Sequence, residues 1–235
     1  DNEGAGYFEV NQKGGVRWNA RKAFLDPAKG RANLTILTEA EVDRIRFDGT
    51  RATGLDLRVK GRVAHVSAGA EIVLAAGAIG TPKILELSGV GDPAILRDHG
   101  IDVVAEHPHV GANLADHLQI RTIFRIRGAE TLNDRYAKLS GKLGIAAEYA
   151  LKRSGPMAMA PSQFGIFTKS SDIHETANIE YHVQPLSLEA FGQPLHDFPA
   201  LTVSVCNLRP ESRGSCHIRS ADPRDVPAIK PNYLS

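Results

Sequence analysis

The stretch AAGAIGTPKILELSGVG occupies residues 75–91 and follows directly on the apolar run 72–74. A uniformly apolar run of this length is typical of a strand covered on both faces, as in a parallel sheet. The small residues that follow it, Ala75, Ala76 and Gly77, let a backbone approach another group closely. Thr81-Pro82 then pairs a capping side chain with a proline in the first helical turn. The stretch therefore predicts a buried strand over 71–77, a tight turn, and a helix that ends at Gly89.

Short strands are predicted on the N-terminal side of this stretch, because apolar and polar residues alternate there as in half-exposed antiparallel strands. These strands cover residues 34–38, 42–47 and 54–61. On the C-terminal side, Asp92-Pro93 begins a second predicted helix, which ends at Gly100. A short strand and then a loop follow, over residues 101–105 and 107–117.

The pattern changes beyond residue 118, where alternating strands dominate and one helix is predicted over 136–152. The predicted strands cover residues 118–127, 163–168, 178–184, 200–208 and 214–219. We interpret this part as one antiparallel sheet with a helix packed against it. The fold class is therefore α/β followed by α+β, with a domain boundary near residue 118.

Composition excludes several classes of function. The chain has 235 residues, of which 42% are hydrophobic, and its 28 Lys and Arg residues nearly balance its 27 Asp and Glu residues. Because there is no basic surplus to neutralise phosphates, we expect no nucleic-acid partner. No apolar run approaches the roughly 18 residues that a transmembrane helix needs. We expect a cytoplasmic protein, with membrane association of the complete protein left open.

A search for catalytic motifs finds no GxGxxG after a strand, no phosphate loop and no GxSxG elbow. His107 and His109 have no third ligand at a typical spacing, so no metal site is predicted. His117 is interpreted as a structural partner of Asp116, because neither a nucleophile nor an oxyanion donor is identifiable nearby. By residue chemistry alone, the sequence contains no complete catalytic set.

The two cysteines and three arginines of the C-terminal part are assigned structural rather than catalytic roles. Cys206 and Cys216 are predicted to be small buried side chains on neighbouring strands, with a disulfide as the alternative. Arg209, Arg213 and Arg219 are predicted to be solvated charges at strand edges, with binding of an anionic substrate as the alternative.

Residues 77–91 resemble the second signature of the glucose–methanol–choline (GMC) oxidoreductase family, flavoenzymes that oxidise alcohols. Ten positions meet the family pattern in register: Gly77, Ala78, Thr81, Pro82, Ile84, Leu85, Ser88, Gly89, Val90 and Gly91. The resemblance extends over nearly the whole chain. It includes residues 15–25, with Asn19 where the family commonly has Ser, the VGANLADH run at 110–117, and the RPESRG to NY run at 209–233.

The resemblance implies a partial FAD-binding, Rossmann-like domain over 1–118 and part of an antiparallel-sheet substrate domain over 119–235. In the family, the first βαβ unit lies upstream of the residues present here, and the catalytic His lies downstream of the NY segment. We therefore expect this chain to be the interior piece of a longer flavoprotein, with no catalytic residue of its own.

Three local roles are implied by the resemblance. The position of Val42 lies along the adenine of FAD and bonds it through backbone groups. The turn at Ala75, Ala76 and Gly77 lies close to the ribose and diphosphate. Gln163 stands where choline-handling relatives carry a Glu that faces the trimethylammonium group. A neutral Gln supplies no countercharge, which favours an uncharged primary alcohol over choline.

The resemblance thus implies FAD as cofactor, a small-molecule alcohol as hydride donor, and a quinone or another carrier, or oxygen, as electron acceptor. Two alternatives remain open. The chain could be a catalytically inert fold fragment with at most weak nucleotide binding, or part of a lyase built on the same fold.

Overall fold

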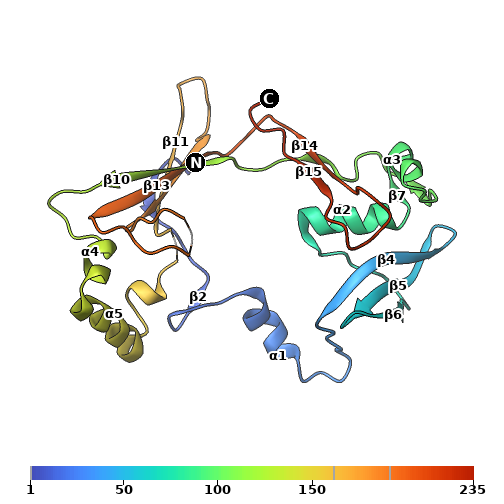
Figure 1. Cartoon of the computed structure of the whole chain (residues 1–235), viewed down its shortest axis with the longest axis horizontal. Helices are drawn as coiled ribbons and strands as arrows, with labels where there is room; N and C mark the ends of the chain where they lie inside the picture. Colours follow the sequence, from blue (N-terminus) through green and yellow to red (C-terminus); the bar gives the residue numbers. More distant parts are fainter. Residues whose placement is uncertain (1, 161, 191) are drawn as a thin grey trace. The chain divides into compact units, whose positions relative to one another are not determined.

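The structure, a computed structural model, describes residues 2–160, 162–190 and 192–235. It divides into two compact units, each made of two segments of the chain (Figure 1). Unit 1 comprises Asp1–Leu34 and His117–Arg209, and unit 2 comprises Thr35–Asp116 and Pro210–Ser235. The break at 116/117 lies close to the predicted boundary at 118. The units differ from the predicted division into 1–118 and 119–235, because the first 34 residues belong to unit 1 and the last 26 to unit 2.

Unit 1 is built on an antiparallel sheet with the strand order β1-β11-β12-β13-β10. Its strands are β1 Gly4–Tyr7, β10 Gln119–Arg125, β11 Phe164–Thr168, β12 Ile179–Gln184 and β13 Ala200–Asn207. The remaining elements are β2 Gln12–Lys13, β3 Val16–Arg17, a π-helix Arg21–Leu25, α1 Asp26–Ala28, α4 Leu132–Ala137, α5 Leu139–Lys152 and a 3-10 turn Pro156–Ala158. The predicted antiparallel sheet is confirmed, although the strand predicted at 214–219 lies in unit 2.

On one face of this sheet, the side chains of β13 are buried although they are small. Along β13, Thr202, Ser204 and Cys206 are buried, whereas the valines that alternate with them are only half-buried. Because successive strand residues point to opposite faces, these three side chains share one face of the sheet. Small side chains let the neighbouring backbone pack closely there, and Thr202 donates a 2.8 Å hydrogen bond to the carbonyl oxygen of Leu186.

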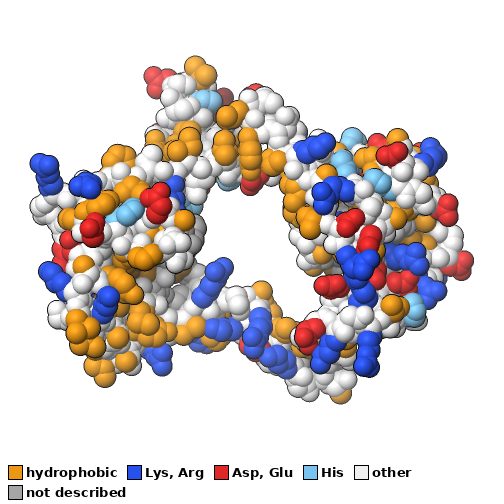
Figure 2. Space-filling view, viewed as in Figure 1, with side chains coloured by type: hydrophobic (Ala, Val, Ile, Leu, Met, Phe, Trp, Pro, Cys, Tyr) orange, Lys and Arg blue, Asp and Glu red, His pale blue; other side chains and the backbone are white. Residues whose placement is uncertain are grey.

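The helix α5 carries an exposed apolar stripe. Leu139, Leu143 and Leu151 recur at multiples of four residues, and their exposed fractions are 72%, 62% and 84%. Residues at this spacing lie on one face of a helix. Ile145 is the buried residue of the helix. Figure 2 shows hydrophobic side chains gathered over α4 and α5.

Two glycines of α5 allow a direct test of its packing. A Cβ atom added to Gly141 would overlap the carbonyl oxygen of Arg135, whereas Gly144 has open space around it. We expect Gly144→Ala to stabilise the protein by about 0.5–1 kcal/mol, because glycine is unfavourable inside a helix. Gly141→Ala should destabilise it by about 1–3 kcal/mol, because the backbone must move. Urea denaturation followed by Trp18 fluorescence checks both; equal shifts of the two midpoints would contradict the expected packing.

Unit 2 contains three small sheets and two helices. An antiparallel sheet has the order β4-β5-β6, a second has the order β15-β14-β9, and β7 pairs in parallel with β8. The elements are β4 Ala40–Asp48, β5 Arg51–Val59, β6 Arg62–Ser67, α2 Gly77–Leu87, β7 Val90–Gly91, α3 Pro93–Asp98, β8 Ala105–Glu106, β9 Ala112–Leu114, β14 Gly214–His217 and β15 Ala228–Lys230. The core of this unit includes the buried residues Ile45, Leu57, Leu87, Leu96 and Ile218.

Three strand predictions are wrong. Of the strand predicted over 101–105, only Ala105 belongs to a strand, β8. Residues 34–38 and 71–75 form no strand at all, and Val73 is 78% exposed rather than covered on both faces. A strand requires a neighbour for its backbone hydrogen bonds, and no described strand lies beside either segment. The apolar side chains of 72–74 therefore remain without the sheet that their sequence predicts.

Of the two predicted helix starts, that of α3 is confirmed and that of α2 is wrong. Asp92 caps α3 as predicted, since its carboxylate accepts a 2.8 Å hydrogen bond from the backbone N–H of Ala94. The prediction that Thr81 caps α2 is wrong, because α2 begins at Gly77 and Pro82 lies inside it. Gly89 ends α2 with a φ of 83°, as predicted, and a Cβ there would overlap the carbonyl oxygen of Asp102. No helix of the described residues is both long and apolar enough to cross a lipid bilayer.

Candidate functional site

Val42 lies at an irregularity of β4, the edge strand of its sheet. Val42 faces Leu57 and Arg44 faces Asp56, so Asp43 has no residue opposite it. Such a bulge re-aims side chains and interrupts the regular pairing of the backbone. The free edge of β4 can accept other groups, as the 2.8 Å hydrogen bond from the backbone N–H of Ile45 to Ser88 Oγ illustrates.

The turn at Ala75, Ala76 and Gly77 is exposed and leads into α2. None of the backbone–backbone hydrogen bonds found among the described residues involves residues 70–75. Ala76 is the N-cap of α2 and provides no side-chain cap. Gly77 has a φ of 78° and open space around its Cα. The first N–H groups of an 11-residue helix are therefore free to bind an anion.

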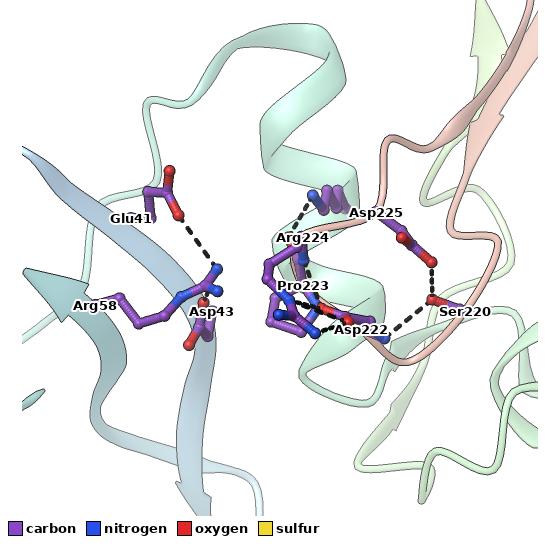
Figure 3. A network of polar contacts seen from close by, with 9 residues as sticks. Glu41, Asp43, Arg58, Ser220, Asp222, Pro223, Arg224 and Asp225 are labelled. Atoms are coloured by element: carbon purple, nitrogen blue, oxygen red, sulfur yellow. Dashed lines mark hydrogen bonds and ion pairs between the residues drawn. The ribbon is translucent and has the colours of Figure 1, made fainter. Parts of the chain in front are cut away.

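Glu41 and Asp43, the sequence neighbours of Val42, both contact Arg58 (Figure 3). Arg58 Nη2 lies 2.9 Å from Asp43 Oδ1 and 3.2 Å from Glu41 Oε2. Arg58 and Asp43 are largely buried, whereas Glu41 is exposed. The Nε of Arg58 is buried and makes no hydrogen bond with the described residues, so one hydrogen-bond donor of this guanidinium has no acceptor among them. These ion pairs hold the side chains on either side of Val42 in place.

A second group of charges in Figure 3 belongs to the loop that precedes β15. Side-chain and backbone hydrogen bonds from Arg224 hold the pKa of Asp222 far below its usual range. Lys83 of α2 donates a 2.6 Å hydrogen bond to the carbonyl oxygen of Pro223. The loop is therefore tied to α2, and Arg58 lies close enough to Asp222 to lower its pKa further.

Three basic side chains contact the carboxylate of Asp56 on the sheet β4-β5-β6. Arg44 Nε lies 2.8 Å, His65 Nδ1 2.7 Å and Arg46 Nε 3.6 Å from its carboxylate. Burial alone would raise the pKa of Asp56, but the hydrogen bonds from Arg44 and His65 lower it below the usual value. These residues line a cleft of about 680 Å³ beside α2.

Gln163 belongs to unit 1 and directly precedes β11. Its carbonyl oxygen accepts a 2.9 Å hydrogen bond from Phe8, and its N–H donates to the carbonyl oxygen of Val183. It therefore extends the strand register, which places its half-buried side chain on the same sheet face as Gly165. Val42 and the turn at 75–77, in contrast, both lie in unit 2.

Two structural predictions for other residues are wrong. His117 Nε2 lies 3.1 Å from the carbonyl oxygen of Leu208, and the Asp116 carboxylate accepts a hydrogen bond from the Tyr233 hydroxyl, so the two do not pair with each other. Cys206 and Cys216 are free and buried, as predicted, but lie on β13 and β14, which belong to different sheets. The disulfide alternative is therefore excluded.

Two further roles are weighed from the sequence: metal binding by His107 and His109, and anion binding by Arg209, Arg213 and Arg219. Among the described residues, neither His107 nor His109 belongs to a group of three potential metal ligands. Arg213 donates hydrogen bonds to three backbone carbonyl groups, at 210, 211 and 212, and Arg219 donates to the carbonyl of Val226. These two arginines thus brace loops.

Sequence reasoning missed the central polar contact of unit 2. Glu86 of α2 is fully buried and accepts hydrogen bonds from His217 Nδ1 at 2.6 Å and from the backbone N–H of Ile218 at 2.8 Å. The available signal was a single acidic residue in the otherwise apolar run 84–87. Its partners could not be identified, because they lie more than 130 residues away.

Comparisons with known proteins agree on one family. A family profile described as GMC oxidoreductase matches residues 1–119. The alcohol dehydrogenase [acceptor] of Pseudomonas putida is 36% identical over 99% of this chain and 43% of its own length. The oxygen-dependent choline dehydrogenase of Brucella ovis is 36% identical over 99% of this chain and 42% of its length. The crystal structure of pyridoxine 4-oxidase from Mesorbium loti superposes with a TM-score of 0.78, at 26% identity over 99% of this chain and 42% of that one. The chain thus spans less than half the length of these proteins.

Proposed function

Because this chain belongs to the GMC oxidoreductase family, we propose that it supplies the adenosine and diphosphate contacts of an FAD site in an enzyme that oxidises alcohols. The observation that carries this proposal is the exposed turn at Ala75, Ala76 and Gly77, whose backbone groups are free and which leads into an uncapped helix. A diphosphate is an anion, and such helix starts bind anions through backbone N–H groups and the helix dipole.

Val42 completes the nucleotide side of the proposed site. Its strand is at a sheet edge, and the bulge at Asp43 interrupts the regular pairing next to it. We assign to Val42 the backbone contacts with adenine. Arg58, with its ion pairs to Glu41 and Asp43, holds this part of the strand in a defined conformation.

In this proposal, the residues of the chain bind and orient, and we assign none of them a proton transfer. When bound, FAD supplies the acceptor for a hydride from the alcohol carbon. The Gly77 backbone and the N–H groups at the start of α2 hold the diphosphate, which fixes the cofactor for that reaction. The electron acceptor of the complete protein would be a quinone or another carrier, or oxygen.

We propose an uncharged primary alcohol as the substrate of the complete protein. Gln163 carries no charge, so a quaternary ammonium group beside it lacks a countercharge. The curated relatives include both an alcohol dehydrogenase and a choline dehydrogenase, so the comparison by itself leaves the two substrate classes open.

The complete protein, purified under anaerobic conditions, provides the test. We expect a flavin absorption spectrum that bleaches on addition of a primary aliphatic alcohol faster than on addition of choline. Gly77→Ala should lower the flavin content, because its Cβ enters the proposed cofactor space. Gly100→Ala is the matched control, since Gly100 also has a positive φ and open surroundings but lies outside the proposed site. A colourless protein, or equal flavin content in the two variants, contradicts the proposal; faster bleaching by choline contradicts only the substrate assignment.

A further inference from the structure

Three side chains of the types that bind metal ions lie together on one face of the five-stranded sheet of unit 1. Glu180 and His182 are two residues apart on β12, so they point to the same face. Cys206 on β13 stands directly opposite Glu180 in the antiparallel register. Strand pairing alone therefore brings the three together, although 23 residues of sequence lie between His182 and Cys206.

The distances within this Glu180–His182–Cys206 cluster fit a single small cation. His182 Nε2 lies 3.1 Å from Glu180 Oε1, and Cys206 Sγ lies 3.9 Å from Glu180 Oε2. One ligand atom from each residue lies within 4.8 Å of the other two. Zn–S and Zn–N distances of about 2.3 and about 2.0 Å put tetrahedral ligand atoms about 3.5 Å apart. Small rotations of the side chains are therefore sufficient to place an ion between them.

Burial and charge also favour a bound cation at this cluster. The exposed fraction of Cys206 is 4%, and Glu180 is also largely shielded from solvent. Among the described residues, Glu180 forms ion pairs or hydrogen bonds only with His182 and Cys206 and has no Lys or Arg partner. A largely buried carboxylate without a permanently charged partner is costly, and a divalent cation would compensate its charge.

One side of the cluster is fixed by an aromatic ring. The Phe8 ring lies with its centroid 5.4 Å from that of His182, and it occupies the space above Gly165, where a Cβ would overlap it. Gly165 stands opposite His182 in the sheet register. The imidazole is therefore held against the sheet by packing, which pre-organises one ligand.

We propose that Glu180, His182 and Cys206 bind a Zn²⁺ ion, with a water molecule as the fourth ligand. The mixed set of one thiolate, one imidazole and one carboxylate suits zinc, and three protein ligands leave the fourth position open. Binding replaces the S–H bond of Cys206 by an S–Zn bond and releases the proton to solvent. The site is independent of the proposed FAD site, which is assigned to residues of unit 2.

Titration of the flavin-free chain with CoCl₂ tests this inference, because a thiolate–Co²⁺ bond produces a near-ultraviolet charge-transfer band. We expect the band to saturate at one equivalent of Co²⁺ and to disappear when ZnCl₂ displaces the ion. Cys206→Ser should abolish the band, and His182→Ala should weaken the apparent affinity by about tenfold or more. Far-ultraviolet circular dichroism verifies that each variant is folded.

Cys216→Ser is the matched control, because Cys216 is also a buried free thiol but belongs to no group of three potential metal ligands among the described residues. This variant should retain the band at full amplitude. If the three side chains only hydrogen-bond to one another, wild-type protein gives no band. That result, or a band that survives Cys206→Ser, overturns the assignment without any bearing on flavin binding.

Discussion

Replacing Glu86 by alanine is expected to destabilise unit 2 by about 3–5 kcal/mol. The carboxylate is fully buried and accepts hydrogen bonds from His217 and from the backbone N–H of Ile218. Alanine leaves both donors without their acceptor in a buried environment, and each unsatisfied group costs about 1–3 kcal/mol. The cavity left by the side chain adds to this loss. Because Glu86 joins α2 to β14, its removal should weaken the attachment of the segment 210–235 to α2.

Chemical denaturation followed by circular dichroism measures the loss, and hydrogen exchange localises it to peptides from α2 and β14. Glu86→Gln should cost less, because its remaining oxygen can still accept one of the two hydrogen bonds. Glu71→Ala is the matched control, since Glu71 is exposed and makes no hydrogen bond or ion pair with the described residues. We would abandon this account if Glu86→Ala and Glu71→Ala had similar unfolding midpoints.

Asn133→Asp is expected to produce the largest loss in unit 1, at least about 3 kcal/mol near neutral pH. The Asn133 amide is buried, and its Nδ2 lies 2.9–3.3 Å from four oxygen atoms: the carbonyl oxygens of Ser187, His196 and Phe198 and the hydroxyl of Ser187. An aspartate has the same shape but no donor, so a carboxylate would face these oxygens without a hydrogen bond. The contacts that join α4 to the segment between β12 and β13 would be lost.

The loss should depend on pH. Burial and the surrounding carbonyl oxygens disfavour the charged form, which raises the folded-state pKa of the introduced carboxyl above its unfolded value. The folded variant then binds the proton more tightly than the unfolded one, so its stability falls as pH rises between the two values. Lowering the pH from about 7 to about 5 should therefore recover part of the loss.

Urea denaturation monitored by Trp18 fluorescence at several pH values provides the measurement, since the single tryptophan lies in unit 1. Asn207→Asp is the control, because Asn207 is exposed and its Oδ1 accepts a 3.0 Å hydrogen bond from the N–H of Arg209, a role that a carboxylate can also fill. A loss in Asn133→Asp that does not change with pH would show that the buried carboxylate is not its cause.

Local features of the fold could be predicted from the sequence because the determining residues are neighbours. The Asp92 cap depends on a contact two residues away, and the strands of unit 1 show their own alternation. The run 72–74 was misjudged for the opposite reason. Its apolar pattern predicts burial on both faces. Whether a strand forms, however, depends on a neighbouring strand elsewhere in the chain.

For the candidate site, the signature at residues 77–91 was sufficient to identify the family, because many residue types stand in a fixed order over a short distance. It also singled out Gly77, which has a positive φ in the structure. Arg58 and Asp222 could not be found in this way, since each is an ordinary surface type of residue whose role depends on a partner in another element.

The sequence by itself therefore determined the family, the antiparallel strands of unit 1 and the C-terminal ends of α2 and α3, all of which depend on short-range patterns. Only the tertiary structure decided that the N-terminal strand β1 joins β11, that β14 joins β9, and that Glu86 meets His217. It also placed Cys206 opposite Glu180. These pairings join distant segments, and many alternative partners satisfy the same local pattern, so the choice among them is made by the packing of the whole unit.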